Sequence, residues 1–134
     1  MQNIGLIANP LLTESLKLRA ELADWLIERM FTVYTVDGRG GQIKSGPLPL
    51  ADLSEVKPDI VIAVGGDGTL LHAARLTAPY GIPILGINMG RLGFLTEIEP
   101  PNIYKDLEQV FAGEYTKDQR MMLQAEVVRN GQVI

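Results

Sequence analysis

The apolar residues of this chain fall into short continuous runs, separated by segments rich in glycine, proline and polar residues. Residues 4–8, 32–36, 59–64 and 83–87 read IGLIA, TVYTV, DIVIAV and PILGI. Short apolar or β-branched runs bounded by turn residues are typical of strands, and strands without a polar face are typical of parallel sheets covered on both sides. These four segments are therefore predicted to be strands of one sheet. Residues 37–49, rich in glycine and proline, are predicted to form a loop.

Three longer segments have the periodicity of helices. Thr13 is a candidate N-cap for the first, whose apolar positions recur at helical spacing. These positions are Leu16, Leu22, Ala23, Leu26, Ile27 and Met30. A second helix is expected to begin near Thr69, and residues 103–111 carry a third apolar stripe. Strands alternating with helices predict an α/β fold, an open Rossmann-like parallel sheet with helices on both faces.

The last residues follow a different pattern. Met121–Arg129 alternates in residue type, and Asn130-Gly131 is a strong signal for a two-residue hairpin turn, so a strand and a short returning strand are predicted. We therefore expect an α/β nucleotide-binding domain over residues 1–118. Residues 119–134 are expected to be the first strand and hairpin turn of a second, all-β domain that this chain only begins.

Composition narrows the possible functions. The 134 residues carry a net charge of −4, which argues against a nucleic-acid surface because such surfaces need clustered Lys and Arg. There are no cysteines, so disulfides and thiolate chemistry are excluded. Neither a secretory signal nor an apolar stretch approaching the ~20 residues of a membrane helix is seen. A cytoplasmic protein without nucleic-acid or membrane partners is expected.

The segment Gly65-Gly66-Asp67-Gly68-Thr69 joins a predicted strand to a predicted helix. Glycines at this place let the backbone adopt positive φ and approach an anion, and the N–H groups at the start of a helix favour phosphate. Asp67 is unusual there because a carboxylate repels phosphate. Binding Mg²⁺, or taking a proton from a hydroxyl nucleophile, would explain it. The alternative is a plain tight turn in which Asp67 caps the helix.

Two familiar nucleotide motifs do not fit the sequence. Lys44-Ser45 follows Ile43 instead of glycine and lies outside a strand–helix junction, so it is not a Walker A loop. The dinucleotide fingerprint would need a third glycine at position 71, where the chain has Leu71. A hydride-transfer site of the usual Rossmann type is therefore not expected.

The GGDGT sequence of residues 65–69 resembles a loop shared by NAD kinases, diacylglycerol-type lipid kinases and phosphofructokinases. A second block, LGINMGRLGFLT at residues 85–96, is similar to the GxNxGxLGFL segment of NAD kinases, whereas lipid kinases have a different segment there. The resemblance covers nearly the whole chain, including Arg120 and Leu123, which in the family open the second domain. By this resemblance the chain is identified as the N-terminal portion of an NAD kinase.

The resemblance implies a reaction and a set of site residues. The γ-phosphoryl group of ATP, or of polyphosphate in some relatives, would move to the adenosine ribose 2′-hydroxyl of NAD and give NADP. Asp67 would be the general base, Mg²⁺ or another divalent metal would accompany ATP, and no residue is assigned as a metal ligand. The residues expected to bind NAD or ATP are Gly65, Gly66, Gly68, Thr69, His72, Asn88, Gly90, Gly93 and Phe94.

Several of these residues also have a simpler interpretation. Phe94 is expected to contact a ring of the dinucleotide, and the alternative is burial in the core. His72 lies in the first turns of the helix, where it would contact the ligand or simply face solvent. Arg91 would reach a phosphate or be solvated, and Arg75 is interpreted as an ion-pair partner at the surface or between domains.

Family enzymes are roughly twice this length. Their C-terminal β domain completes the NAD site and carries much of the oligomer interface, so a homo-oligomer is expected for the full-length enzyme. We expect the 134-residue chain by itself to have little or no kinase activity. Two alternative functions stay open: another kinase of the GGDGT superfamily, acting on a lipid or sugar, and a non-catalytic nucleotide-binding module.

Overall fold

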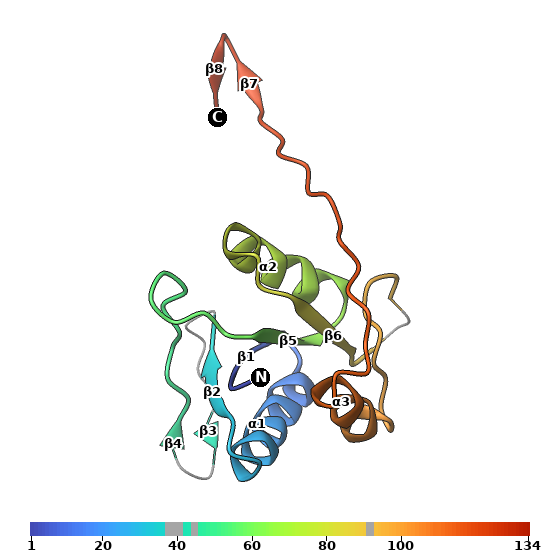
Figure 1. Cartoon of the computed structure of the whole chain (residues 1–134). Helices are drawn as coiled ribbons and strands as arrows, with labels where there is room; N and C mark the ends of the chain where they lie inside the picture. Colours follow the sequence, from blue (N-terminus) through green and yellow to red (C-terminus); the bar gives the residue numbers. More distant parts are fainter. Residues whose placement is uncertain (37–41, 44–45, 91–92) are drawn as a thin grey trace.

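A computed structural model describes residues 1–36, 42–43, 46–90 and 93–134 of the chain (Figure 1). The strands are β1 (Asn3–Ala8), β2 (Thr32–Thr35), β3 (Gln42–Ile43), β4 (Gly46–Pro47), β5 (Ile60–Gly65), β6 (Ile84–Asn88), β7 (Val128–Arg129) and β8 (Gln132–Val133). The helices are α1 (Thr13–Glu28), α2 (Asp67–Thr77), the 3₁₀ helix η1 (Ala78–Tyr80) and α3 (Ile103–Phe111).

The four predicted strands form one parallel sheet in the order β2-β1-β5-β6. Ile4 pairs with Ile60 between β1 and β5, and Val64 pairs with Ile87 between β5 and β6. Every residue of β5 is buried, as the absence of a polar face predicted. The predicted α/β fold with an open parallel sheet is confirmed.

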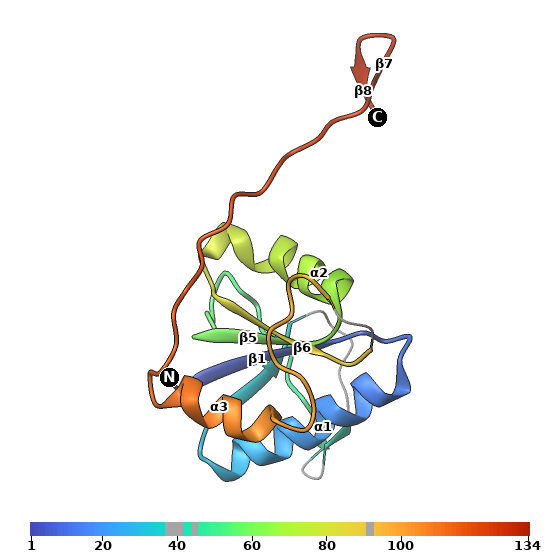
Figure 2. The same ribbon diagram turned by 90° about the vertical axis from the view of Figure 1, so that its right-hand side faces the viewer.

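The sheet is the middle of three layers, with α1 and α3 on one face and α2 on the other (Figure 2). Side chains at alternate positions of each strand point to opposite faces of the sheet, and they form two apolar cores, one on each face. The α1–α3 core contains Ile4, Leu6, Leu22, Leu26, Ile62, Val64, Ile87 and Leu107. The α2 core contains Ile7, Val61, Ala63, Ala73 and Ile82. Burial of these residues fixes the strand register, because a shift by one residue would exchange the two faces.

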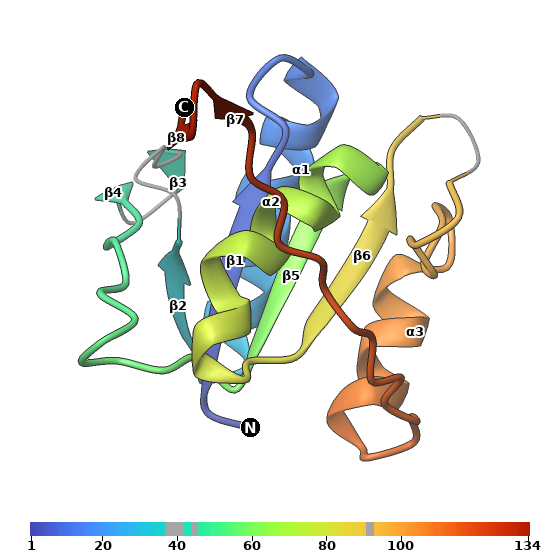
Figure 3. The ribbon, with the colours of Figure 1, turned by 90° about the horizontal axis from the view of Figure 1, so that it is seen from above.

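The connections that follow β1 and β5 leave the sheet on opposite faces. The chain leaves β1 through α1 toward β2, and leaves β5 through α2 toward β6, on the opposite face and in the opposite direction (Figure 3). The two connections therefore diverge between β1 and β5. In open α/β sheets, ligands bind outside the carboxyl ends of the strands at such a point. A ligand is therefore expected beside the segments that follow β1, β5 and β6.

Two details of the first helix differ from the prediction. Thr13 is the first helical residue and not the cap, because Leu12 occupies the N-cap position and makes no side-chain capping bond. Met30 lies beyond the helix, in the left-handed region with φ 70°, and is exposed. Its N–H donates to the Ile27 carbonyl and the Phe31 N–H to the Leu26 carbonyl, which is the hydrogen-bond pattern of a Schellman C-cap. Helical spacing in the sequence thus continues past the turn that ends the helix.

The predicted loop 37–49 contains the short antiparallel pair β3–β4. Residues 37–41 and 44–45 of this predicted loop lie outside the described residues. So does Arg91, predicted either to reach a phosphate or to be solvated. Where the chain rejoins the sheet, Leu50 forms a parallel bridge with Thr35. This bridge extends the edge of the sheet beside β2.

The C-terminal segment forms the predicted turn but only part of the predicted strand. Asn130 and Gly131, with φ 54° and 77°, connect β7 to β8 as a two-residue hairpin. Of the strand predicted over residues 121–129, only Val128–Arg129 is extended in a ladder, and all residues from 112 to 134 are exposed. A two-stranded hairpin without a third strand or a covering helix has little to stabilise it. The hairpin fits the start of a second domain, and the boundary at residue 118 stays a prediction.

In the part of the chain that the structure describes, no helix is both long enough and apolar enough to cross a membrane.

Candidate active site at the carboxyl ends of β1, β5 and β6

The first part of the site is the start of α2, which follows β5 directly. The helix begins at Asp67, two residues earlier than predicted, with Gly66 at the N-cap and no side-chain capping bond. The first hydrogen bond of the helix runs from the Leu70 N–H to the Gly66 carbonyl at 3.1 Å. The N–H groups of Asp67, Gly68 and Thr69 therefore have no acceptor within the helix. These N–H groups and the helix dipole suit an anion.

At Gly65, glycine is needed for space and not for backbone conformation. The sequence predicts positive φ here, but among the described glycines only Gly81, Gly113 and Gly131 have it. A Cβ on Gly65 would collide with the Thr69 hydroxyl and would lie 2.9 Å from the Thr69 Cβ. A Cβ on Gly66 or Gly68 would meet no neighbour within 4 Å, so the surfaces of these two residues are open to a ligand. The close approach of β5 to α2 thus explains the first glycine only.

The Asp67 side chain does not cap its own helix and does not point into the sheet. It reaches across to the segment after β6, where its Oδ2 accepts a hydrogen bond from the Phe94 N–H at 2.8 Å. Its Oδ1 accepts one from the Leu95 N–H at 2.9 Å. The interpretation of Asp67 as a helix cap is therefore wrong. The carboxylate lies at the carboxyl edge of the sheet, between the loop after β5 and the loop after β6.

These contacts also set the ionisation of the carboxylate. Hydrogen bonds from the backbone N–H groups of Phe94 and then Leu95 hold the pKa of the Asp67 carboxyl below its ordinary value of 3.8. Asp67 is thus an anion at neutral pH. The groups that stabilise it are neutral backbone dipoles and not charged side chains.

The loop after β6 brings the residues of the second block next to Asp67. Asn88 is buried, and its Oδ1 accepts a long 3.4 Å hydrogen bond from the Gly90 N–H, so it shapes the turn. The Met89 N–H donates to the Gly65 carbonyl at 2.6 Å and ties this loop to the end of β5. Phe94 is 96% exposed, which rules out the alternative of core burial. Its ring is available to an external partner.

A shallow hollow lies on the other side of the helix start. It has a volume of about 470 Å³ and is lined by Ala8, Asn9, Pro10, Leu11, Gly68, Thr69 and His72. His72 is exposed and faces this hollow from the first turns of α2. Arg75, one turn further along, is exposed on the same helix.

Asn9 also lines this hollow. The sequence does not single it out, because Asn9-Pro10 has the pattern of an ordinary turn. Its N–H donates to the Val64 carbonyl at 3.0 Å, which places it directly beside the end of β5. Its Oδ1 accepts a hydrogen bond from the Leu11 N–H at 3.0 Å. A signal is nevertheless present in the sequence, because the residue after β1 must lie near the residue after β5 once both are neighbours in a parallel sheet.

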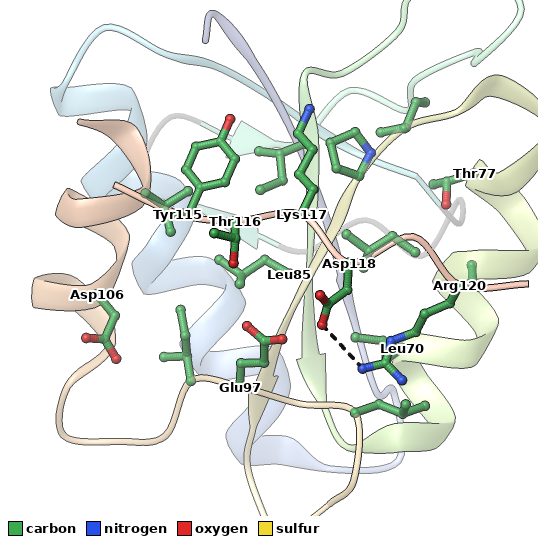
Figure 4. A pocket seen from close by; sticks show the side chains of 18 of the residues that line it. Leu70, Thr77, Leu85, Glu97, Asp106, Tyr115, Thr116, Lys117, Asp118 and Arg120 are labelled. Carbon is green, nitrogen blue, oxygen red and sulfur yellow. Dashed lines mark ion pairs between the residues drawn. The ribbon is translucent and has the colours of Figure 1, made fainter. Parts of the chain in front are cut away.

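A larger hollow of about 540 Å³ runs along β6, between α2 and α3 (Figure 4). Residues 114–118 pass over it, and Asp118 pairs with Arg120 at 3.6 Å. Its walls are mainly apolar, with Glu97 and Asp106 among the charged residues. No residue of the predicted site lines it, so the smaller hollow is the better candidate for the chemistry.

The sequence of this chain matches a known protein family. Residues 4–115 match the family described as the ATP-NAD kinase N-terminal domain. The chain is 39% identical over 131 residues to an NAD kinase of Heliobacterium modesticaldum and 41% identical over 133 residues to one of Caldanaerobacter subterraneus, covering 98% and 97% of this chain. It spans 46% of the length of each of these relatives.

The fold has a solved counterpart as well. Yeast NADH kinase, in a crystal structure with NADH, superposes with a TM-score of 0.70 at 19% identity, over 85% of this chain and 39% of the yeast chain. That likeness concerns the fold, whereas the match over residues 4–115 concerns the sequence itself. The chain belongs to the NAD kinase family, and residues 4–115 correspond to the N-terminal domain of that family.

Proposed function

We propose that the protein containing this chain transfers the γ-phosphoryl group of ATP to the 2′-hydroxyl of the adenosine ribose of NAD, giving NADP. One observation carries the proposal: the Asp67 carboxylate is held at the carboxyl edge of the sheet, between the free N–H groups of α2 and the exposed ring of Phe94. Membership of the NAD kinase family supports the choice of substrate.

The acceptor would bind on the β6 side of Asp67. Phe94 offers an open aromatic face there, and stacking of one aromatic group on another is worth about 0.5–1.5 kcal/mol beyond the area it buries. The ribose hydroxyl would then donate its hydrogen bond to the Asp67 carboxylate, which takes the proton as the phosphoryl group arrives. Positioning is the main demand of phosphoryl transfer, so a carboxylate of lowered pKa is adequate as the acceptor of this proton.

The donor would bind on the β1 side, because β1 and β6 flank β5 on opposite sides. The hollow beside Asn9 and His72 opens there, and the first N–H groups of α2 point to the place where phosphate oxygens would lie. The absence of side chains at Gly66 and Gly68 lets a phosphate approach the backbone. Donor and acceptor would thus meet at Asp67 from two sides.

The divalent metal is best treated as part of the nucleotide. Among the described residues, no group of three or more His, Asp or Glu side chains is placed to hold a metal ion. Asp67 belongs to no such group. Mg²⁺ would therefore arrive coordinated to the phosphates of ATP, where it neutralises their charge.

The residues of this chain leave Asp67 partly open to solvent. Catalysis of phosphoryl transfer depends on excluding water from charged groups. We therefore propose that the remaining length found in the relatives closes the site, and that the 134-residue chain alone turns over little or no NAD. We also propose that the full-length enzyme is a homo-oligomer in the cytoplasm.

A comparison of acceptors tests the proposed reaction. The full-length protein is incubated with ATP–Mg²⁺ or polyphosphate and with NAD, NADH, diacylglycerol or a hexose phosphate, and the phosphorylated product is identified. NADP from NAD is the expected product, and ³¹P NMR should place the new phosphate on the ribose 2′ position. Phosphorylation of the lipid or the sugar in preference to NAD would assign the protein to another GGDGT kinase.

Asp67→Asn separates a kinase from a binding module. Asparagine keeps the size of the side chain and removes the charge that repels phosphate. A pure binding module keeps or gains affinity for ATP and has no turnover to lose, whereas the proposed kinase loses turnover. Calorimetric titration of ATP into both proteins, beside the NADP assay, distinguishes the two.

A further inference from the structure

We infer that Gly93 is a positioning residue: its missing side chain lets the loop after β6 bring two backbone N–H groups onto the Asp67 carboxylate, and this contact fixes where the carboxylate points. The contact itself is independent of the reaction, and only its catalytic consequence rests on the proposed function. The role is distinct from the ligand contact expected for Gly93 from the sequence.

The space beside Gly93 is taken by Asp67 itself. A Cβ on Gly93 would lie 2.5 Å from the Asp67 Oδ1 and 3.0 Å from its Cγ. It would also lie 3.0 Å from the Thr96 Oγ1. Asp67 has a short side chain anchored in the first turn of α2, so it can move away only by giving up the hydrogen bonds from the Phe94 and Leu95 N–H groups.

The loop cannot easily move away instead, because its returning arm is bonded to β6. The N–H groups of Glu97 and Ile98 donate to the Gly86 carbonyl at 3.2 and 3.1 Å, and the Asn88 N–H donates to the Ile98 carbonyl at 2.8 Å. Thr96 also packs tightly, since a Cβ on Gly86 would lie 2.9 Å from its Cγ2. The loop is therefore seated against the sheet at the same end where it holds Asp67.

A second glycine of the same loop provides the contrast. Gly90 is exposed and has no atom within 4 Å of the position that a Cβ would occupy. Its N–H meets Asn88 and not Asp67. Alanine at position 90 should therefore leave the carboxylate contact intact, while alanine at position 93 should break it.

The contact is measured first, without reference to activity, in the full-length protein. The amide proton signals of Phe94 and Leu95 are recorded by NMR at neutral pH for the parent protein, Asp67→Asn, Gly93→Ala and Gly90→Ala. Loss of a charged acceptor should move both signals upfield in Asp67→Asn and in Gly93→Ala, with Gly90→Ala like the parent. Unchanged signals in Gly93→Ala would overturn the inference even if the protein is an NAD kinase.

Kinetics then measure the consequence. Gly93→Ala should lower kcat for NADP formation by about 100-fold, the scale of a misplaced catalytic group, with a smaller change in the KM for NAD. The acidic limb of its pH profile should move to higher pH, because the Asp67 pKa returns toward 3.8. A rise in KM at unchanged kcat would show that Gly93 only lines the NAD pocket. If the amide signals change as expected but kcat does not, the contact stands and the role of Asp67 as base fails.

A rescue variant covers the case in which Gly93→Ala does not fold. Adding Asp67→Ala removes the Oδ1 and Cγ atoms that the new methyl group would meet. The double variant should then have a higher Tm than Gly93→Ala. A double variant that unfolds as readily as Gly93→Ala would show that the clash lies elsewhere and would overturn the inference.

Discussion

The GGDGT loop, residues 65–69, contains two glycines for which the structure predicts opposite effects of the same substitution. Alanine at Gly65 must fit against the side chain of Thr69, whose Cβ would be 2.9 Å away, and against the Asn9 Cβ at 3.2 Å. Alanine at Gly68 meets no atom within 4 Å and lies in the first turn of a helix. The first substitution should destabilise the fold, and the second should not.

The magnitudes follow from the two surroundings. Overpacking a close contact costs about 1–3 kcal/mol, and Gly65 cannot relax cheaply because it is the last residue of a fully buried strand. In a helix, alanine is favoured over glycine by up to about 1 kcal/mol. For a chain of this size, 1 kcal/mol corresponds to about 4 °C in Tm. We expect Gly65→Ala to lower the Tm by about 4–12 °C and Gly68→Ala to raise it by up to about 4 °C.

Thermal unfolding of the chain, followed by tryptophan fluorescence, measures both shifts in Tm. Trp25 is the single tryptophan and packs against Tyr104 and Phe111 with ring centroids 5.1 and 6.4 Å apart, so its emission reports unfolding of α1 from α3. Equal destabilisation by the two substitutions would refute the reasoning, because it would mean that conformation and not space selects glycine here. In the full-length enzyme, Gly68→Ala should nevertheless weaken ATP binding, since the methyl group would occupy the proposed phosphate path.

Two further predictions concern residues outside this loop. Asp59 accepts hydrogen bonds from the Asn3 and Gln2 N–H groups, which lower its pKa in the folded state. Its contribution to the stability of the fold is therefore present above pH 3.8 and is lost as the pH falls through the folded pKa. Asp59→Asn should cost about 0.5–1 kcal/mol at pH 7, discounted for solvent exposure, and should flatten the loss of stability below pH 3.8 in acid titrations; an equally steep loss would contradict the assignment. Phe94→Ala should change the free energy of unfolding by less than about 0.5 kcal/mol, because the ring is 96% exposed. The same change should raise the KM for NAD about 3- to 10-fold, and an unchanged KM would remove Phe94 from the site.

The main sheet could be predicted from the sequence because its strands are buried on both faces. Continuous apolar runs leave little choice of structure, and β5 and β6 lie within one residue of their predicted bounds. Most of the strand predicted at residues 121–129 does not form, because these residues are exposed. Its alternation needs a partner sheet to cover the apolar side, and the described part of the chain supplies none for Met121 or Leu123, both more than 90% exposed.

The position of the site could also be predicted, but its contacts could not. A glycine loop between strand and helix must lie at the carboxyl edge of the sheet, which is where Asp67 is found. The bonds from Phe94 and Leu95 join residues 27 and 28 positions apart, and no local pattern encodes such a contact. The same is true of Gly93, which the sequence assigns to ligand binding and which lies against the Asp67 side chain in the structure. The periodicity of apolar residues indicates which residues are buried. The contacts of Asp67 depend instead on how the loop after β6 packs against the start of α2.

The most direct test of the proposed chemistry is the turnover of Asp67→Asn in the full-length enzyme, with Asp52→Asn as the matched control. Asp52 accepts hydrogen bonds from the Ser54 hydroxyl at 2.6 Å and from the Ser54 N–H at 3.0 Å, which lower its pKa, but it belongs to neither loop of the site. Loss of a general base should reduce kcat for NADP formation by about 10²- to 10⁴-fold in Asp67→Asn and leave Asp52→Asn near the parent value. Turnover of folded Asp67→Asn within a few-fold of the parent would contradict the assignment of Asp67 as the group that receives the proton of the ribose hydroxyl.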